Sequence, residues 1–265
     1  MAVLDMISLT RSFGSLVAVD HLSLSVEAGE IFGLLGRNGA GKTTVIKMLT
    51  TLLPPTSGNA WIGGLDLIHE AGAIRRIIGY VPQLVSADGT LTAYENLLVF
   101  AKLYDIPRAE QQERIKAALA FMGLEEAKDR LVREYSGGMI RRLEIAQSTL
   151  HRPEVLFLDE PTVGLDPLAR ETVWEHVEQL RSRSRTTIVL TTHDMEEADR
   201  LCDRIAIMHR GKSVALGTPN QLKAEVSGVD VTLSDVFVHF TGDTPEAEAG
   251  YRATTLARRT ARRLG

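Results

Sequence analysis

A glycine-rich segment with a lysine and a threonine at fixed positions constrains the fold of this chain more than any other feature. Residues 36–43 read GRNGAGKT and fit the pattern GxxxxGK[ST], directly after the apolar run Ile31–Leu35 and before an amphipathic segment. The glycines let successive backbone N–H groups turn inward, and the following helix N-terminus adds partial positive charge. Lys42 then supplies a point charge for β- and γ-phosphates, and the Thr43 hydroxyl supplies a Mg²⁺ ligand. The segment predicts a strand–loop–helix unit that binds a nucleoside triphosphate.

Short β-branched runs alternate with longer amphipathic stretches along the rest of the chain. The predicted strands are Ala2–Ser8, Val17–Val26, Ile31–Leu35, Ile78–Val81, Val155–Leu158, Thr186–Thr191 and Arg204–Met208. Runs such as VLFL and TIVL are apolar without alternation, which is typical of strands covered on both faces of a mainly parallel sheet. The predicted fold class is therefore α/β.

The stretch from about residue 84 to 150 differs from its surroundings because it holds three helix-like segments and almost no strand signal. The first of these segments opens with Thr92 and Glu95 at the spacing of a capping box, just before an apolar run. We expect a helical insert that forms a subdomain between two strands of the core.

The charge balance and the distribution of apolar residues exclude several classes of protein. Lys and Arg number 30 against 34 Asp and Glu, which gives a net charge of −4 and predicts no nucleic-acid partner. No window approaches the roughly 18–20 apolar residues that a membrane helix needs, and the start lacks a secretion signal. Because Cys202 is the only cysteine, it forms no internal disulfide; we expect it to be buried in a protein of the cytosol.

Two acids and a histidine follow predicted strands of the core. Asp159 and Glu160 come directly after an apolar strand, so both emerge at the carboxyl edge of the sheet, where ligands of such folds collect. Asp159 suits the Mg²⁺ shell, and Glu160 would polarise the water that attacks the γ-phosphate. A lone histidine is more often structural, but His193 follows another strand and would reach the γ-phosphate or that water. The other histidines lack metal-ligand spacing, so we assign no zinc or iron site.

The identity of the base depends on weaker signals. The chain has no NKxD, the guanine-reading pattern of common GTPases. Phe13 lies ahead of the phosphate-binding strand and offers a face on which adenine would stack, although packing of Phe13 in the core is an equal alternative.

At Tyr135–Met139, which reads YSGGM, the chain resembles the ATP-binding subunits of ABC transporters over roughly residues 3–220. The motifs of that family occur in order and with its spacing. They are the aromatic Phe13; the Walker A segment Gly36, Arg37, Asn38, Gly39, Ala40, Gly41, Lys42, Thr43 and Thr44; Gln83; the signature Ser136, Gly137 and Gly138; the Walker B acids Asp159 and Glu160; the D-loop Gly164–Asp166; and the switch His193.

The resemblance implies a P-loop NTPase core with a mainly parallel sheet, an N-terminal antiparallel β-subdomain and an inserted helical subdomain. It implies an ATP-binding domain over residues 1–228 and a C-terminal extension over 229–265. The tail from Tyr251 carries arginines without acids and would either adhere to anionic lipid or, as we favour, form a solvated terminus.

The same resemblance assigns roles to the motif residues. It implies ATP and Mg²⁺ as cofactors, with Glu160, His193 and Gln83 as catalytic residues, and Thr43, Gln83 and Asp159 at the metal. It also implies that Ser136, Gly137 and Gly138 clamp the ATP of a second subunit, either another copy or a paralogue. The N-terminus of the helix that follows them suits such a phosphate clamp. The implied partner is a separately encoded transmembrane permease, which places the chain at the cytoplasmic face of the membrane.

Two further segments resemble the daunorubicin-resistance type of multidrug exporter subunit. They are YSGGM followed by IRRL, and Leu233–Phe237 ahead of Thr241–Gly242. The signature has Tyr135 and Met139 where the usual LSGGQ has leucine and glutamine. The effect of these two differences stays open. The resemblance implies ATP hydrolysis that powers export of drugs or other amphipathic compounds.

Two alternative functions stay open at the level of the sequence. A soluble ABC-type ATPase that acts on the ribosome or nucleic acid is disfavoured by the single cassette, the lack of a long coiled-coil insert and the net charge. A non-catalytic nucleotide-sensing adaptor is disfavoured by the presence of Glu160 and His193.

Overall fold

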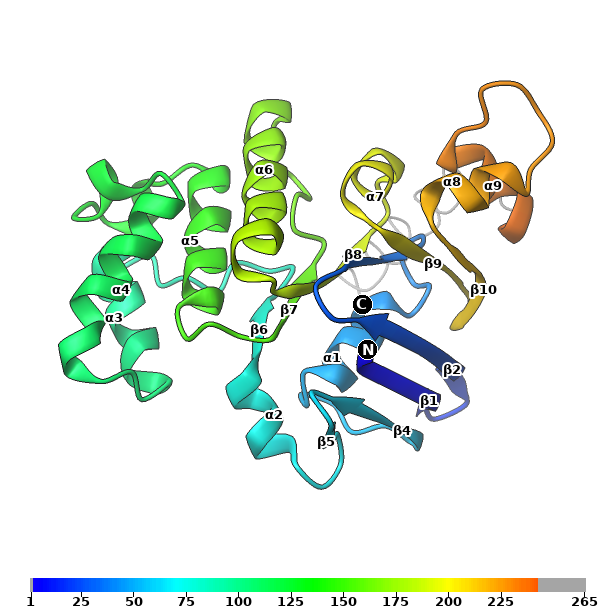
Figure 1. Cartoon of the computed structure of the whole chain (residues 1–265), viewed down its shortest axis with the longest axis horizontal. Helices are drawn as coiled ribbons and strands as arrows, with labels where there is room; N and C mark the ends of the chain where they lie inside the picture. Colours follow the sequence, from blue (N-terminus) through cyan, green and yellow to red (C-terminus); the bar gives the residue numbers. More distant parts are fainter. Residues whose placement is uncertain (1, 243–265) are drawn as a thin grey trace, which may run out of the picture.

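The computed structural model describes residues 2–242, in which the chain forms two β-sheets and a set of helices (Figure 1). The strands are β1 Ala2–Phe13, β2 Leu16–Glu27, β3 Ile31–Leu35, β4 Ser57–Ile62, β5 Leu65–Asp66, β6 Ile78–Val81, β7 Val155–Asp159, β8 Thr187–Thr192, β9 Arg204–His209 and β10 Lys212–Gly217. The α-helices are α1 Lys42–Leu49, α2 Ala71–Ile77, α3 Ala93–Leu103, α4 Arg108–Phe121, α5 Gly137–Thr149, α6 Pro167–Ser184, α7 Met195–Leu201, α8 Pro219–Ala224 and α9 Leu233–Thr241, and the 3₁₀ turns are η1 Glu125–Ala127 and η2 Val132–Glu134.

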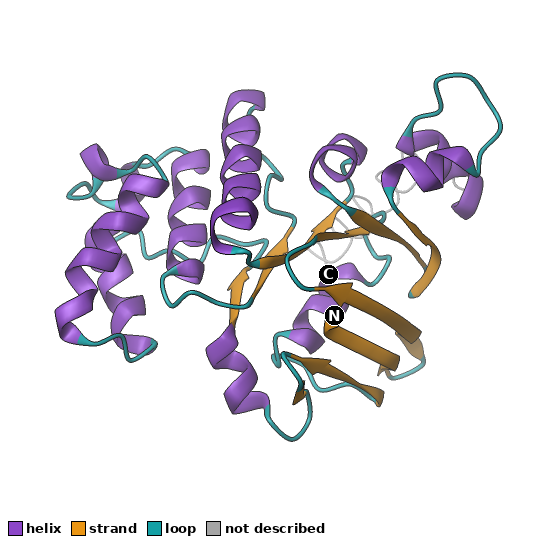
Figure 2. Ribbon diagram, viewed as in Figure 1, coloured by secondary structure: helices purple, strands orange, loops and turns teal. Residues whose placement is uncertain are grey.

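The larger sheet carries the predicted α/β core. Its strand order is β10-β9-β3-β8-β7-β6, and all neighbours are parallel except β10 and β9. The smaller sheet has the order β2-β1-β4-β5 and is antiparallel, as expected for the N-terminal subdomain. The α/β fold class with a mainly parallel sheet is therefore confirmed, and Figure 2 shows the two sheets beside the helices.

The strand register brings the carboxyl ends of the parallel strands to one edge. The paired residues at this edge are Leu35 with Thr192, Asp159 with Thr191, and Val81 with Leu158. The segments that follow β3, β6, β7 and β8 therefore leave the sheet side by side, although they are far apart in the sequence.

Two hydrophobic clusters cover the two faces of this sheet. Phe32 and Leu34 of β3 belong to the cluster that also holds α1 and the antiparallel sheet, whereas Ile31 and Leu35 belong to the cluster shared with the helices α3 to α7. Successive side chains of a strand point to opposite faces, so a strand covered on both faces is apolar throughout. This explains the absence of alternation in the sequence.

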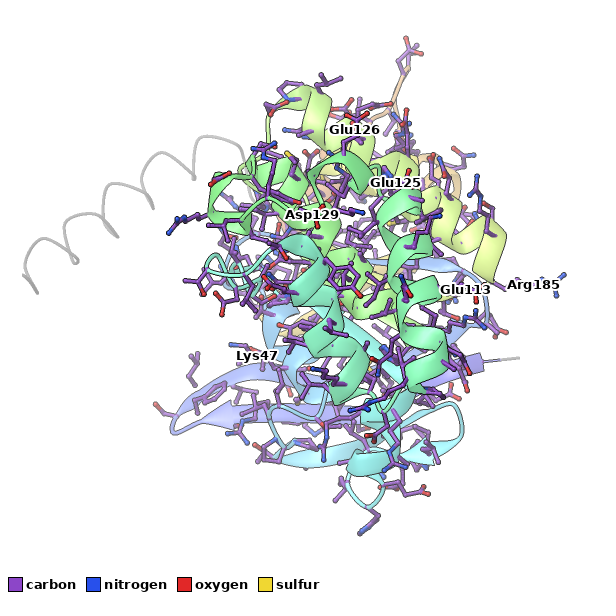
Figure 3. The ribbon with its side chains drawn as sticks, turned by 90° about the vertical axis from the view of Figure 1, so that its left-hand side faces the viewer. Lys47, Glu113, Glu125, Glu126, Asp129 and Arg185 are labelled. Carbon is purple, nitrogen blue, oxygen red and sulfur yellow. The ribbon has the colours of Figure 1, made fainter. Side chains whose placement is uncertain are left out.

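The helical insert contains α3, α4 and α5, with η1 and η2 between α4 and α5. The capping box predicted from Thr92 and Glu95 is present: the Thr92 hydroxyl accepts from the Glu95 N–H, and the Glu95 carboxylate accepts from the Thr92 N–H. Helix α4 buries Ile115 and Leu119. Exposed acids lie on the outer surface of the insert, as Figure 3 shows for Glu113, Glu125, Glu126 and Asp129.

The prediction omitted β4, β5 and β10 and ended β1 at Ser8, five residues before Phe13, where the strand ends. Strand β4 reads SGNAWI, and a run rich in small and polar residues has little intrinsic strand preference. Its backbone pairs with β1, with Ile62 opposite Leu4 and Ser57 opposite Thr10. Pairing with β1 therefore makes this segment a strand, and the composition of the segment alone does not indicate a strand.

The last described elements pack back on the core. Helix α9 buries Leu233, Val236 and Phe237 and contacts α7, α8 and β10.

Between residues 2 and 242 no helix is long and apolar enough to cross a membrane. Cys202 is buried, as predicted, and burial raises the pKa of its thiol. The arginine-rich tail from Tyr251 lies outside the described residues.

We predict that His151 makes the stability of the fold depend on pH. Its Nε2 donates to the Ile78 carbonyl over 2.9 Å, its ring stacks on Tyr104 at 3.7 Å between centroids, and burial lowers its pKa. Because the folded state resists protonation of this ring, the free energy of unfolding should fall as the pH drops below about 6.5. Urea unfolding at pH 7.5 and 5.5 should show a larger loss for the wild type than for His151→Phe, which keeps an aromatic ring. Equal losses in both proteins would contradict this prediction.

Candidate nucleotide-binding site

The phosphate loop, Gly36–Thr44, connects β3 to α1, and its glycines are required by space and by backbone conformation. A Cβ at Gly36 would lie 2.5 Å from the Met208 carbonyl oxygen. Gly41 has a φ of 104°, and a Cβ there would overlap the Ala18 carbonyl oxygen. Any larger residue at either position would displace the loop, so the local fold accepts only glycine.

Lys42 begins α1, but its side chain turns back into the loop. The residue is 5% exposed, and its Nζ donates to the Gly36 carbonyl over 2.6 Å. The same ammonium lies 2.9 Å from Glu160 Oε1, which is also buried. A buried ammonium needs negative or polar partners, and here a carboxylate and a carbonyl provide them.

Asp159 ends β7 and lies beside two hydroxyl groups. Its Oδ1 accepts from Thr43 Oγ1 over 3.1 Å and from Thr191 Oγ1 over 2.6 Å. A carboxylate and a hydroxyl at this separation are oxygen ligands of the kind that Mg²⁺ prefers, and Mg²⁺ commonly adds nucleotide phosphates to one or two carboxylates. The residues present therefore fit the predicted metal.

Glu160 has an unusual backbone conformation, and its side chain lies between Lys42 and His193. Its φ is 52°, in the left-handed region that costs energy for a residue with a Cβ. Oε2 lies 2.7 Å from His193 Nδ1, while Oε1 faces Lys42.

The charges around Glu160 determine its protonation. Burial alone would raise the pKa of Glu160, but the hydrogen bond with His193 and the charge of Lys42 outweigh burial and lower it. The hydrogen bond with Glu160 raises the pKa of His193 above its ordinary value, despite partial burial. The glutamate is thus held ionised, in a position where it can accept a proton or orient a water molecule.

The structure brings together Lys42, Thr43, Asp159, Glu160 and His193, and other predicted residues lie farther out. Gln83 is exposed just after β6, at the same sheet edge. Phe13 is 47% exposed, with the Arg11 guanidinium 4.7 Å from its ring centroid. Its ring is therefore on the surface and not in the core.

The signature residues form the start of a helix. Ser136 is the N-cap of α5 and accepts from the Met139 N–H, and Gly137 and Gly138 form the first turn. Helix α5 lies among the helices α3 to α6, apart from α1 (Figure 1). Within one subunit the signature is therefore separate from the phosphate loop.

Sequence reasoning missed Thr191 and Arg141. Besides its bond to Asp159, the Thr191 hydroxyl accepts from the Glu160 N–H over 3.0 Å. Arg141 is buried and donates to the carbonyls of Pro82 and Gln83, over 2.8 and 3.1 Å. Two threonines that follow the apolar run 188–190 at the end of β8 were the available signal for Thr191. The sequence around Arg141 held no signal for this role, because the carbonyls to which Arg141 donates lie almost sixty residues away.

A phosphate loop between a buried parallel strand and a helix, with acids at the end of a strand in the same sheet, defines a P-loop nucleotide-binding protein. The family model described as ABC transporter matches residues 19–163. The chain therefore belongs to the ABC transporter family.

Named relatives and solved structures agree with this assignment. The chain is 41% identical over 244 residues to the probable multidrug ABC transporter ATP-binding protein YbhF of Escherichia coli. The aligned region covers 91% of this chain and 42% of YbhF. It is 42% identical to Nod factor export ATP-binding protein I of Cupriavidus metallidurans, over 87% of this chain and 76% of that protein. The chain thus spans about two fifths of the length of YbhF.

Two solved structures share the fold. One is the ATP-binding subunit of an ABC transporter, with a TM-score of 0.80 and 29% identity over 90% of this chain and 99% of the other. Another is cbiO1 of Clostridium perfringens, part of the ABC transporter complex cbiONQ, with a TM-score of 0.78 and 27% identity over 84% and 91% of the two chains.

We predict that the Tyr135 hydroxyl fixes the segment before the signature. It is buried and donates to the Ala127 carbonyl over 2.6 Å, which ties this segment to η1. Loss of one such hydrogen bond costs about 1 kcal/mol. Tyr135→Phe should lower the free energy of unfolding by about that amount and speed amide exchange in residues 127–136. Tyr104→Phe, which removes a hydroxyl elsewhere in the insert, is the control. Unchanged exchange in Tyr135→Phe would contradict the prediction.

Proposed function

We propose that this chain is the ATP-hydrolysing subunit of an exporter and powers a separately encoded membrane protein. The observation that carries the proposal is the buried Glu160 carboxylate, held between Lys42 at 2.9 Å and His193 at 2.7 Å beside the phosphate loop. The names of relatives at 41–42% identity, a probable multidrug transporter protein and a Nod factor exporter protein, support export. The proposed cargo class is drugs or other amphipathic compounds.

Each residue of the site has a role in this proposal. Backbone N–H groups of the phosphate loop and Lys42 bind the β- and γ-phosphates, which compete with Glu160 for the ammonium. Thr43, Asp159 and Gln83 would hold Mg²⁺, which neutralises phosphate charge when bound. Glu160 accepts a proton from the attacking water or orients it, and His193 holds the second carboxylate oxygen. The exposed ring of Phe13 stacks on adenine.

The proposed working unit contains two ATPase subunits, either two copies of this chain or one copy and a paralogue. In it, Ser136, Gly137 and Gly138 bind the γ-phosphate held by the other subunit. Their position at the N-terminus of α5, a helix of 13 residues, supports this role, because N–H groups and the helix dipole favour an anion there. Hydrolysis then removes contacts that hold the dimer closed.

The membrane permease is the proposed second partner, with this chain bound at the cytoplasmic face. Leu84 and Val85, which are 81% and 62% exposed, follow Gln83 and give this loop an apolar surface for such a contact. We further propose that residues 1–228 form the ATP-binding domain, with the helical insert at about 84–150, and that residues 229–265 form an extension.

Glu160→Gln should keep ATP binding and lose turnover, because the neutral amide accepts no proton but leaves Lys42 available to phosphate. We expect phosphate release to fall by about 100-fold or more. Light scattering after gel filtration with Mg²⁺ and ATP should show an accumulated dimer. Adding Ser136→Arg should abolish that dimer while circular dichroism stays native. Rapid hydrolysis by Glu160→Gln would exclude Glu160 as the base, and undiminished dimerisation of the double variant would exclude the signature clamp.

The proposed partner is tested by purifying the tagged full chain from its native membranes in mild detergent. We expect a multi-spanning membrane protein to copurify and to raise ATP turnover. Lys42→Ala is the control: it should retain the partner but show no turnover, since it lacks the phosphate-binding charge. Recovery with ribosomes or nucleic acid and without a membrane protein would favour the soluble alternative.

A further inference from the structure

Glu197 is a buried acid that the proposed mechanism does not use. It lies in the first turn of α7 and is 1% exposed. Its Oε1 accepts from Thr162 Oγ1 over 2.6 Å and from Trp174 Nε1 over 2.9 Å. Burial raises the pKa of Glu197, and these hydrogen bonds lower it in part. A carboxyl group this deeply buried is expensive unless several donors satisfy it, as they do here.

The first of these donors holds the segment that leaves Glu160. Thr162 follows Glu160 by two residues and is itself buried. Its hydroxyl gives Glu197 the shorter of these two hydrogen bonds. The chain just after the glutamate is thereby fastened to α7, an element that begins thirty-three residues later in the sequence.

The segment around His193 is held at the start of the same helix. Thr192 directly precedes the histidine, and its Oγ1 accepts from the Asp194 N–H over 2.9 Å. Asp194 is the N-cap of α7, and its Oδ1 accepts from the Glu197 N–H over 3.4 Å. The two neighbours of His193 are therefore bonded to each other and, through Asp194, to the residue that binds Thr162. Arg170 of α6 adds an ion pair of 3.0 Å to Asp194.

We propose that Glu197 is a positioning residue: one buried carboxylate fastens the segment after Glu160 to the segment around His193 and so keeps Glu160 Oε2 and His193 Nδ1 at 2.7 Å. The inference rests on the proposed function, because positioning affects turnover only if the chain hydrolyses ATP. The other donor, Trp174, joins the carboxylate to α6 and holds neither of the two residues directly. Its removal therefore tests whether a loss of stability alone lowers ATP turnover.

The test removes the hydrogen bonds of single side chains and leaves Glu197 in place. Thr162→Val and Thr192→Val keep the branched shape but lose the hydroxyl, whereas Thr162→Ser and Thr192→Ser keep the hydroxyl. Trp174→Phe removes the other donor to Glu197 and some buried volume. The measurements are kcat of the full chain with its membrane partner, the Kd of a non-hydrolysable ATP analogue, and the free energy of unfolding.

We expect each valine variant to lose about tenfold or more in kcat, because small misplacements of catalytic groups are costly, with Kd within about threefold of wild type. Each serine variant should retain kcat within about threefold. Trp174→Phe should lose stability at least as much as the valine variants but keep kcat. A loss of kcat that follows stability across all five variants, or valine variants as active as wild type, would overturn the proposal.

Hydrogen exchange distinguishes failure of this inference from failure of the proposed function. A wild-type chain without turnover beside its partner would refute hydrolysis, but not the connection between the two segments. Thr192→Val should still speed exchange of the Asp194 amide, because that N–H donates to the Thr192 hydroxyl. Unchanged exchange at residues 192–198 in Thr192→Val and at 160–166 in Thr162→Val would overturn the connection, whatever the turnover.

Discussion

The parallel pairing of β3, β8 and β7 is the constraint on which the rest of the site depends. Parallel strands in register end together, so the segments after Leu35, Asp159 and Thr192 meet at one edge. A shift by one residue in any of these strands would exchange its two faces and move its terminal side chain by about 3.3 Å. Both faces of the sheet are buried in apolar clusters, and the hydrophobic packing that stabilises the fold therefore also fixes the distances in the site.

Within that frame the buried pair of Lys42 and Glu160 determines how the site can respond to a ligand. Removing one partner of a buried ion pair typically costs about 3–5 kcal/mol, so the carboxylate leaves the ammonium only when another anion replaces it. In the proposed function a phosphate is that anion. Glu160 keeps His193 as its second partner, which leaves a charged oxygen beside the phosphates. Ligand binding itself would thus prepare the base.

Contiguous motifs in the sequence predict the parts of the structure that local chemistry determines. The bounds of β3 and β6 follow from apolar runs, and the capping box at Thr92 follows from a spacing of three residues. The contacts that complete the site join distant segments instead. Thr191 reaches Asp159 across 32 positions and Thr162 reaches Glu197 across 35, and a single sequence has no signal for such pairs. Strand β4 was missed for the same reason, since its partner and not its composition makes it a strand.

The insert shows how the outer parts of the site are connected to each other. Arg141 lies on α5, the helix that begins at the signature, and bonds to the carbonyls of Pro82 and Gln83. Glu144, one turn later, pairs with Arg141 and accepts from the Ser86 hydroxyl. Burial lowers the pKa of Arg141, and the charge of Glu144 raises it in part. The signature helix and the loop of Gln83 are therefore held as one body. Displacing this loop relative to α5 would break the hydrogen bonds that the buried Arg141 and Glu144 make with it, whereas moving the loop and the signature helix together would keep them.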